Sequence, residues 1–244
     1  MTRAAAARAV AEAPEAAAAE SGTAVPAGLT ATDTAAVSDA LDMLGLDGCL
    51  PGLHHLSGRG FVAGPAFTLR YEPVDEGEPG PAGDFLDDVP PGSVVVIANE
   101  GRTGATVWGD VLSRVARHRA VAGTVIDGVC RDIGGSRAVG YPVWARGVFM
   151  RSGKNRVRLR AVGSTVEVCG VAVAHGDLVC ADESGVVVVD RRQAERVAEL
   201  VADIREREER IVTAALAGRS LAAARREFGY HGLARPVESK PWHP

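Results

Sequence analysis

Hydrophobic residues recur along the chain with two different periods, which separate candidate strands from candidate helices. A continuous apolar run of strand length occurs at residues 94–97, and residues 124–126 begin a second buried strand. Between them, residues 106–119 carry apolar side chains at helical spacing. A strand, a helix and a second buried strand in this order predict a βαβ unit with parallel strands.

The region before this unit shows weaker patterns of the same two kinds. Thr32 or Asp33 is placed to cap a helix that ends near Gly45, and residues 61–71 have the composition of a strand. Residues 72–92 are rich in Pro, Gly and Asp, which predicts a long loop with a short turn of helix.

The second half of the chain predicts short strands followed by one long helix. Residues 191–216 place apolar side chains on one face and charges on the other, as in an amphipathic helix. Turn-forming clusters of Gly, Asp and Ser separate the predicted strands, which indicates hairpins. These strands are residues 143–145, 165–168, 171–173, 178–180 and 186–189.

Composition adds the domain organisation. The chain has 244 residues, of which 46% are hydrophobic and only 5% aromatic, as expected for a single α/β domain with an aliphatic core. Residues 1–27 are rich in Ala and poor in bulky apolar side chains, which predicts a disordered tail. We expect the domain to span residues 28–222 and an irregular tail to occupy residues 223–244.

Charge, cysteine usage and hydropathy exclude several classes of protein. The net charge of -4 gives no field that would gather phosphates, so we expect no nucleic-acid partner. The four cysteines are widely spaced without a C-x-x-C pair, which favours reduced thiols and a cytoplasmic protein. No run of eighteen apolar residues occurs and the Ala-rich start lacks the core of a signal peptide, so we expect no membrane partner.

Polar residues follow each element of the predicted βαβ unit. Segment 99–101 (Asn-Glu-Gly) follows the first strand, Gly109 and Asp110 lie near the helix start, and Arg131 and Asp132 follow the second strand. These three places face one crevice in a parallel βαβ unit. Free N–H groups near the helix start would hold a carboxylate, and the Arg131 guanidinium would clamp the same anion.

The aspartates of this group suit a divalent metal. Asp132 offers hard oxygen ligands for Mg²⁺ or Mn²⁺, and Asp110 is placed to hold a water on that metal. On spacing alone, a surface ion pair of Arg131 with Asp132 explains the pattern equally well.

The spacing of these residues resembles the motif of the RraA-like family, in which Gly109-Asp110 is followed after twenty intervening residues by Arg131-Asp132. That family includes the class II pyruvate aldolases that act on 4-hydroxy-4-methyl-2-oxoglutarate. The resemblance covers roughly residues 29–215 and includes four further segments in the family order, at residues 64–68, 125–128, 141–147 and 176–182. It implies a three-layer β/β/α sandwich that assembles as a homotrimer or a dimer of trimers, with active sites at subunit clefts.

The resemblance also implies a role for each motif residue. Asp132 would bind the divalent metal, Arg131 would contact the keto acid and steady the developing enolate, and Asp110 would orient water on the metal. The implied reactions are cleavage of 4-hydroxy-4-methyl-2-oxoglutarate or related acids to pyruvate, and decarboxylation of oxaloacetate. Both leave an enolate, which a Lewis acid and a cation stabilise. The implied binding residues for the small keto-acid substrate are Gly109, Asp110, Val111, Leu112 and Arg131.

Two alternatives stay open. Many family members carry Glu or Asp three places after the motif aspartate, where this chain has Gly135, and this departure suggests a member diverted to another enolate reaction in biosynthesis. Other members are non-catalytic regulators that bind a protein partner such as ribonuclease E. Those tend to lack the motif aspartate, so Asp132 favours the enzyme. An acidic residue from a neighbouring subunit also joins such sites, and the candidates are Glu208 and Glu209.

The lysines of the chain test an alternative chemistry, in which a lysine forms a Schiff base with the keto acid. The chain has two lysines, Lys154 and Lys240. Lys240 lies in a Pro-rich tail, and Lys154 lies in a loop within the basic stretch 151–160. The strand-like alternation of this stretch would allow it to reach an acidic substrate, but such a pattern is more often a solvated face. Neither position is typical of a desolvated amine, which favours the metal mechanism.

Overall fold

The computed structural model describes residues 24–74 and 84–230. The predicted disorder of the first 23 residues and most of the predicted irregular tail therefore lie outside the described residues. No helix in the described part is long and apolar enough to cross a membrane. All four cysteines are free thiols, as their spacing predicts.

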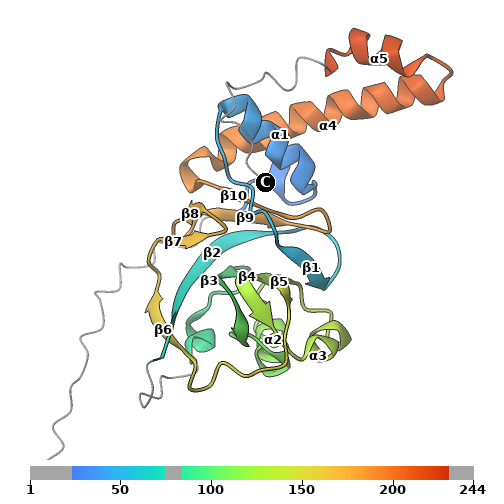
Figure 1. Ribbon diagram of the computed structural model, residues 1–244. Helices are drawn as coiled ribbons and strands as arrows, with labels where there is room; N and C mark the ends of the chain where they lie inside the picture. Colours follow the sequence, from blue (N-terminus) through green and yellow to red (C-terminus); the bar gives the residue numbers. More distant parts are fainter. Residues whose placement is uncertain (1–23, 75–83, 231–244) are drawn as a thin grey trace, which may run out of the picture.

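One long strand, β2 (Val62–Pro73), organises the main sheet because successive parts of it pair with different neighbours. Its first residues pair antiparallel with β9 (Leu178–Ala181), its middle pairs parallel with β3 (Val94–Thr106), and its end pairs antiparallel with β6 (Val157–Val162). The strand order is β1-β5-β4-β3-β2-β9-β10, and the sheet curls on itself (Figure 1). The remaining strands are β1 (His54–Ser57), β4 (Gly123–Cys130), β5 (Val143–Val148), β10 (Val186–Val189) and the separate pair β7 (Val166–Val168) and β8 (Val171–Val173).

Helices cover both outer faces of this curled sheet (Figure 1). Helices α2 (Asp110–His118) and α3 (Ile133–Ala138) cover β3, β4 and β5, whereas α1 (Thr34–Leu44) and α4 (Ala194–Leu216) cover β9 and β10. A third apolar cluster fills the space between the two halves of the sheet. The α/β single-domain prediction is confirmed, and α1 and α4 add one helical layer to the predicted β/β/α order.

Local sequence signals explain the elements that the sequence analysis predicts correctly. The Asp33 carboxylate accepts the Ala36 N–H at 2.8 Å and caps α1, while Gly45 ends the helix in the left-handed conformation. Strands β3 and β4 pair in parallel, and α2 lies between them along the chain, as the βαβ pattern predicts. The predicted hairpins are β7 with β8 and β9 with β10, and residues 191–216 form a 3₁₀ turn followed by α4.

The predicted end of the first strand of the βαβ unit is wrong. Strand β3 continues to Thr106, and α2 begins only at Asp110. Glu100 and Gly101 have positive φ angles of 50° and 66°, and the register of β3 against β4 jumps between Ala98 and Arg102. A bulge therefore absorbs the polar segment within the strand instead of ending it. Strand β1 and helix α3 are further elements that the sequence analysis does not predict.

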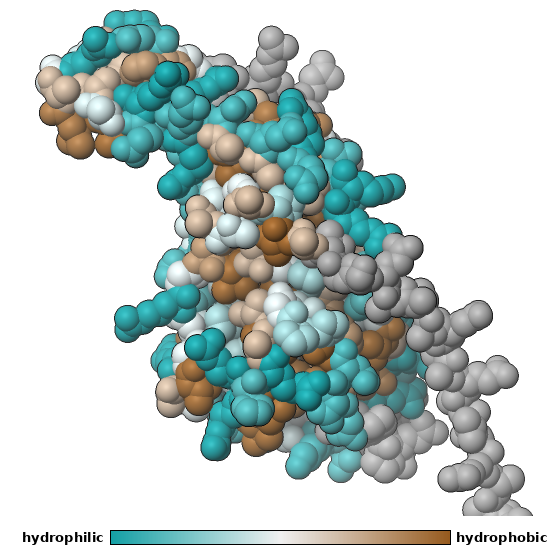
Figure 2. Space-filling model, turned by 180° about the vertical axis from the view of Figure 1, so that it is seen from behind, coloured by the Kyte–Doolittle hydropathy of each residue, from teal (hydrophilic) through white to brown (hydrophobic). Residues whose placement is uncertain are grey.

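The C-terminal helices form an arm that projects from the body (Figure 1). Helix α5 (Leu221–Glu227) follows α4 and crosses the predicted domain boundary at residues 222–223. Figure 2 shows hydrophobic surface near the end of this arm, where Leu216 is 85% exposed and Leu221 is also exposed.

Asp182 attaches α1 to the turn between β9 and β10. Its carboxylate accepts hydrogen bonds from the Thr34 N–H at 2.8 Å and the Thr34 hydroxyl at 2.7 Å, and from the backbone of Ser184 and Gly185. Burial alone would raise the pKa of Asp182, but these hydrogen bonds outweigh it and hold the pKa below the ordinary value of 3.8. The charged form is therefore the one that stabilises the fold.

We expect Asp182→Asn to lower the free energy of unfolding by about 1–3 kcal/mol at neutral pH, because several donors lose a charged acceptor. The depressed pKa makes this stabilisation complete above the ordinary aspartate range and lost as the pH falls through the folded-state pKa. Urea unfolding of both proteins at neutral and acidic pH measures it. A difference between the proteins that persists unchanged in acid would contradict the assignment.

Candidate active site

Two short connections meet at one edge of the sheet, and a backbone hydrogen bond joins them. The first leads from β3 to α2 through Trp108 and Gly109, and the second leads from β4 to α3 through Arg131 and Asp132. The Arg131 N–H donates to the Trp108 carbonyl at 3.0 Å. Residues 23 positions apart in sequence are therefore fixed side by side, which brings the two halves of the motif together.

Gly109 permits this close approach. A Cβ at this position would lie 3.1 Å from Asp132 Oδ2 and 3.5 Å from Arg131 Nε. Those two side chains form an ion pair with an Nε–Oδ2 distance of 3.1 Å. Their side chains are 37% and 46% exposed, which leaves both accessible to a ligand and to water.

Asp132 holds a backbone conformation that few side chains adopt. Its φ and ψ angles are 55° and 34°, in the left-handed region, and it precedes the first residue of α3. In this conformation its carboxylate makes no capping hydrogen bond to α3, although aspartate at this position commonly does. The carboxylate is instead directed toward Arg131 and Gly109, which is the kind of local strain found at functional sites.

Gly135 sets the position of Asp110. A Cβ on Gly135 would lie 2.5 Å from the Cβ of Asp110, closer than real Cβ contacts allow. The residue that departs from the family pattern therefore makes room for the first residue of α2. Any side chain at residue 135 would push Asp110 away from its present place.

A buried hydrogen-bond network ties the starts of α2 and α3 to the cavity wall. The Trp108 indole N–H donates to Ser113 Oγ at 2.8 Å, and Ser113 Oγ lies 2.7 Å from Ser136 Oγ. Trp108 also stacks on Tyr141 with a ring-centroid distance of 5.9 Å. Because both serines are fully buried, this network fixes α2, α3 and Trp108 relative to one another.

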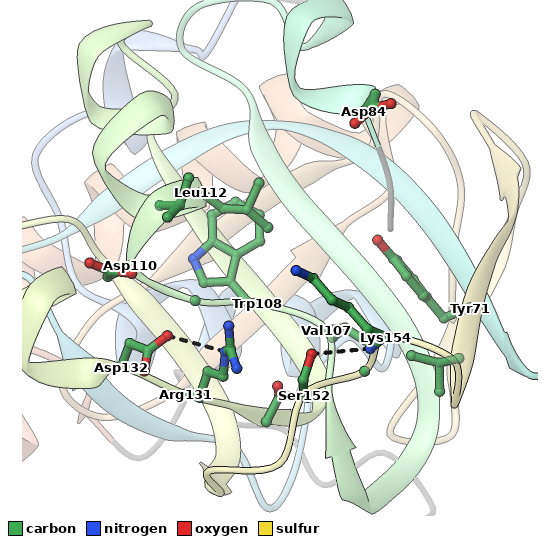
Figure 3. Close-up of a pocket in the computed structure, with 15 residues that line it drawn as sticks. Tyr71, Asp84, Val107, Trp108, Asp110, Leu112, Arg131, Asp132, Ser152 and Lys154 are labelled. Atoms are coloured by element: carbon green, nitrogen blue, oxygen red, sulfur yellow. Dashed lines mark hydrogen bonds and ion pairs between the residues drawn. The ribbon is translucent and has the colours of Figure 1, made fainter. Parts of the chain in front are cut away.

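The motif side chains line a cavity of about 310 Å³ (Figure 3). This volume lies at the small end of the range for ligand pockets, so the cavity suits a small molecule. The start of α2 forms one wall, where helix geometry leaves the first N–H groups without intrahelical acceptors. The lining comprises Tyr71, Asp84, residues 106–112, Arg131, Asp132, residues 152–154 and Val157.

All the predicted motif residues line this cavity, whereas other predicted positions do not. Gly109, Asp110, Arg131 and Asp132 are brought together, and Val111 and Leu112 belong to the same wall. Segment 99–101, expected at the same crevice, is not part of the lining, because the bulge keeps it within β3. Glu208 and Glu209 lie on α4, in the helical layer on the other side of the sheet, so within one chain they do not reach the cavity.

The sequence analysis did not identify Lys154 as a site residue. Figure 3 shows its side chain reaching into the cavity from the side opposite Asp110 and Asp132. The loop assignment is confirmed, but the basic stretch is not a uniform solvated face. Arg158 and Arg160 pair with Glu72, and of the stretch's basic side chains only Lys154 lines the cavity. No local pattern signals this, because a distant strand positions the loop.

The donor set fits a metal that needs few protein ligands. Within residues 24–74 and 84–230, no three Asp, Glu, His or Cys side chains gather as a metal site of their own. Mg²⁺ is commonly held by one or two carboxylates together with water and substrate, and the cavity offers Asp132 and Asp110. With Asp84, the lining holds three carboxylates against two cations, so a divalent ion would reverse its formal charge and favour an anionic ligand.

Taken together, the fold and the cavity define an α/β protein in which aspartates and an arginine line a small cavity at the ends of parallel strands. A family model described as RraA-like (Aldolase/RraA) matches residues 34–188, which include every motif residue. The chain belongs to the RraA-like family.

Among the similar proteins, one is named as a putative aldolase and another is described as a member of an inhibitor family. The chain is 31% identical to "Putative 4-hydroxy-4-methyl-2-oxoglutarate aldolase" of Halalkalibacterium halodurans, over 67% of this chain and 75% of that protein. It is 38% identical to protein DlpA of Legionella pneumophila over 81% of this chain, but it spans only 32% of DlpA.

Solved structures show the same fold. An uncharacterized protein from Pseudomonas syringae pv. tomato is 40% identical, with a TM-score of 0.78 over 84% of this chain and all of the other. Streptomyces coelicolor RraAS2, described as an unusual member of the RNase ES inhibitor RraA family, is 31% identical, with a TM-score of 0.67 over 72% of this chain and 89% of the other.

The two neighbouring glycines of α3 provide a matched test of the site's packing. We expect Gly135→Ala to lower the free energy of unfolding by about 1–3 kcal/mol, because the new methyl group collides with Asp110. Gly134→Ala is the control: its Cβ would meet nothing within 4 Å, and alanine favours the helix by up to about 1 kcal/mol. Urea unfolding midpoints measure both, and equal effects of the two substitutions would refute the packing argument.

Proposed function

We propose that this protein is a divalent-metal-dependent lyase that cleaves a carbon–carbon bond of a small 2-keto acid. The observation that carries the proposal is the convergence of Asp110, Arg131 and Asp132 on one small cavity beside the start of α2. Retro-aldol cleavage of a 4-hydroxy-4-methyl-2-oxoglutarate-type acid and decarboxylation of oxaloacetate both fit this site. In each, the electron pair of the bond to carbon 3 passes toward the 2-keto group and leaves a pyruvate enolate, which is then protonated at carbon 3. The other fragment leaves as CO₂ from oxaloacetate. In the retro-aldol reaction it leaves as a second keto acid, after the 4-hydroxyl has given its proton to water.

The chain's own residues bind the substrate and stabilise its charge. The free N–H groups at the start of α2 donate hydrogen bonds to the carboxylate next to the keto group, and the positive end of the helix favours that anion. The Arg131 guanidinium donates to the keto oxygen, where negative charge develops. Trp108 and Val107 form an apolar wall that excludes bulk water and strengthens these interactions.

A metal would be held at the acidic side of the cavity. Asp132 is its direct ligand in this proposal, and Asp110 holds it through water. A divalent cation, Mg²⁺ or Mn²⁺, supplies Lewis-acid stabilisation of the developing enolate when it is bound. The Asp132 carboxylate is suited to this role because it makes no capping bond to α3.

A regulatory role without catalysis is the second candidate. It is favoured by the similarity to RraAS2, which is described within an inhibitor family. Asp132 favours the lyase, because the non-catalytic members of the family tend to lack the motif aspartate. A third reading, another enolate reaction in biosynthesis, uses the same residues and differs only in substrate.

Asp132→Asn tests the lyase directly. Asparagine tolerates the left-handed conformation, so the fold is expected to persist while the metal loses its charged ligand. Oxaloacetate decarboxylation in the presence of Mg²⁺ should fall by at least about a hundredfold. The wild-type protein should lose the same activity in EDTA and regain it when Mg²⁺ or Mn²⁺ is restored.

Asp203→Asn is the matched control, since Asp203 is exposed on α4 and the same single charge is removed. It should leave the rate unchanged. Pyruvate release that is indifferent to both EDTA and Asp132→Asn would end the lyase proposal. Binding of a ribonuclease E-type protein without turnover would then support the regulator.

We further propose that the protein acts as a homotrimer or a dimer of trimers. Apolar side chains near the cavity support self-association, since Met150 is 77% and Val111 68% exposed. Sedimentation equilibrium should give three or six times the chain mass of 25.3 kDa. Met150→Asp should shift the protein toward smaller species, and a wild-type monomer at micromolar concentration would contradict the assembly.

A further inference from the structure

We propose that Lys154 is a catalytic acid of this site, whose ammonium gives carbon 3 of the enolate its proton after the carbon–carbon bond has broken. This inference rests on the proposed function, which leaves the source of that proton open. Lys154 lines the cavity, and its side chain reaches in from the side opposite Asp110 and Asp132 (Figure 3). Among the described residues that line the cavity there is no other lysine and no histidine.

The shape of the enolate directs carbon 3 toward Lys154. Carbon 2 of an enolate is planar, and its carboxylate, its oxygen and carbon 3 point in three different directions. In the proposed binding mode, the start of α2 holds the carboxylate and Arg131 holds the oxygen. Carbon 3 therefore points toward the remaining part of the lining, which includes residues 152–154 and Tyr71.

Lys154 is the strongest acid in that part of the lining. Burial raises the pKa of the Tyr71 phenol above its ordinary value of 10.0, whereas the ordinary pKa of a lysine is about 10.4. The hydroxyls of Ser152 and Thr106 are weaker acids still. Asp84 is exposed, and an exposed carboxylate carries no proton at neutral pH. Since a general acid works best when its pKa lies near the working pH, the ammonium is the favoured donor.

The loop that carries Lys154 is fixed against the end of β3. The Thr106 N–H donates to the Arg151 carbonyl at 3.1 Å, and a β-bridge joins Thr106 to Ser152. The Lys154 N–H donates to Ser152 Oγ at 3.2 Å. A Cβ on Gly153 would lie 2.2 Å from the Thr106 carbonyl oxygen, so only glycine allows this contact. The backbone that carries the ammonium is thus positioned before a ligand binds.

The surroundings of Lys154 allow it to give a proton and to take another back. Within the described residues its ammonium forms no ion pair, whereas Arg158 and Arg160 of the same stretch pair with Glu72. An ion pair would hold the proton on the nitrogen more tightly. In the proposed step, one N–H bond of the ammonium breaks as the new C–H bond forms. Because Lys154 is exposed, the neutral amine regains its proton from water.

The same step in reverse gives a measurable exchange. In D₂O, the neutral Lys154 amine removes a methyl proton from bound pyruvate, and the ammonium returns a deuteron once its hydrogens have exchanged with the solvent. We expect ¹H NMR to show that the wild-type protein with Mg²⁺ replaces the methyl protons of pyruvate by deuterium. Lys154→Gln should slow this exchange by about a hundredfold or more, as expected for the loss of a general acid–base group.

Lys154→Arg separates proton transfer from positive charge. Arginine keeps the charge but does not release its proton in proteins, so this variant should lose the exchange as Lys154→Gln does. The disappearance of oxaloacetate requires only cleavage of the carbon–carbon bond, and in both variants its rate should change by less than about tenfold. Asp132→Asn should lose both reactions, because it removes the proposed metal ligand.

Arg114→Gln is the matched control, because Arg114 is exposed on α2 outside the cavity and the same charge is removed. It should leave both rates unchanged. Exchange that persists in Lys154→Gln overturns the inference. Exchange that is lost in Lys154→Gln but kept in Lys154→Arg shows that only the charge matters, and it overturns the proton transfer.

Two further outcomes separate this inference from the proposed function. An equal loss of exchange and of cleavage in both Lys154 variants indicates a structural or substrate-binding role and overturns the proton transfer. A wild-type protein that cleaves oxaloacetate without exchanging the protons of pyruvate overturns this inference alone. A wild-type protein that does neither overturns the proposed function as well.

Discussion

The site depends on the contact between two chain connections that only small residues permit. The hydrogen bond from the Arg131 N–H to the Trp108 carbonyl brings the ends of β3 and β4 into contact. The absence of a side chain at Gly109 and at Gly135 lets Asp132 and Asp110 approach from either side. The two connections pack so closely that their side chains have few alternative arrangements. The backbone therefore fixes the relative positions of the charged side chains.

This arrangement places like charges together before any ligand binds. Two aspartates lie beside one arginine at the acidic side of the cavity, and the buried serine network holds the helices that carry them. The fold contributes stability elsewhere, in the three apolar clusters between its layers. A well-packed scaffold is what allows an incompletely compensated group of charges to be kept ready for a ligand.

Sequence patterns predicted the parts of the molecule that depend on local signals. Helix α1 has a capping aspartate and a terminating glycine, and β4 begins with the buried segment 124–126, so both are predictable from neighbouring residues. The motif spacing likewise identified Arg131 and Asp132. The length of β3 was missed because a bulge carries the strand through polar residues that normally end one.

The missed site residue has a different cause. Lys154 belongs to a loop whose position is set by Thr106, almost fifty positions earlier, and neither residue carries a pattern that indicates the other. Helix α3 escaped prediction for a related reason, since it is six residues long and contains two glycines. Both cases show contacts distant in sequence overriding local preference.

The left-handed backbone at residue 132 has a consequence for how function is gained and lost in this fold. Aspartate and asparagine are among the few non-glycine residues that accept such a conformation, so the scaffold restricts which amino acids this position tolerates. An exchange between these two residues alters one charge and leaves the architecture intact. A single nucleotide change thus suffices to remove the negative charge at this position and keep the shape of the protein, so members of one fold can differ in this charge without differing in architecture.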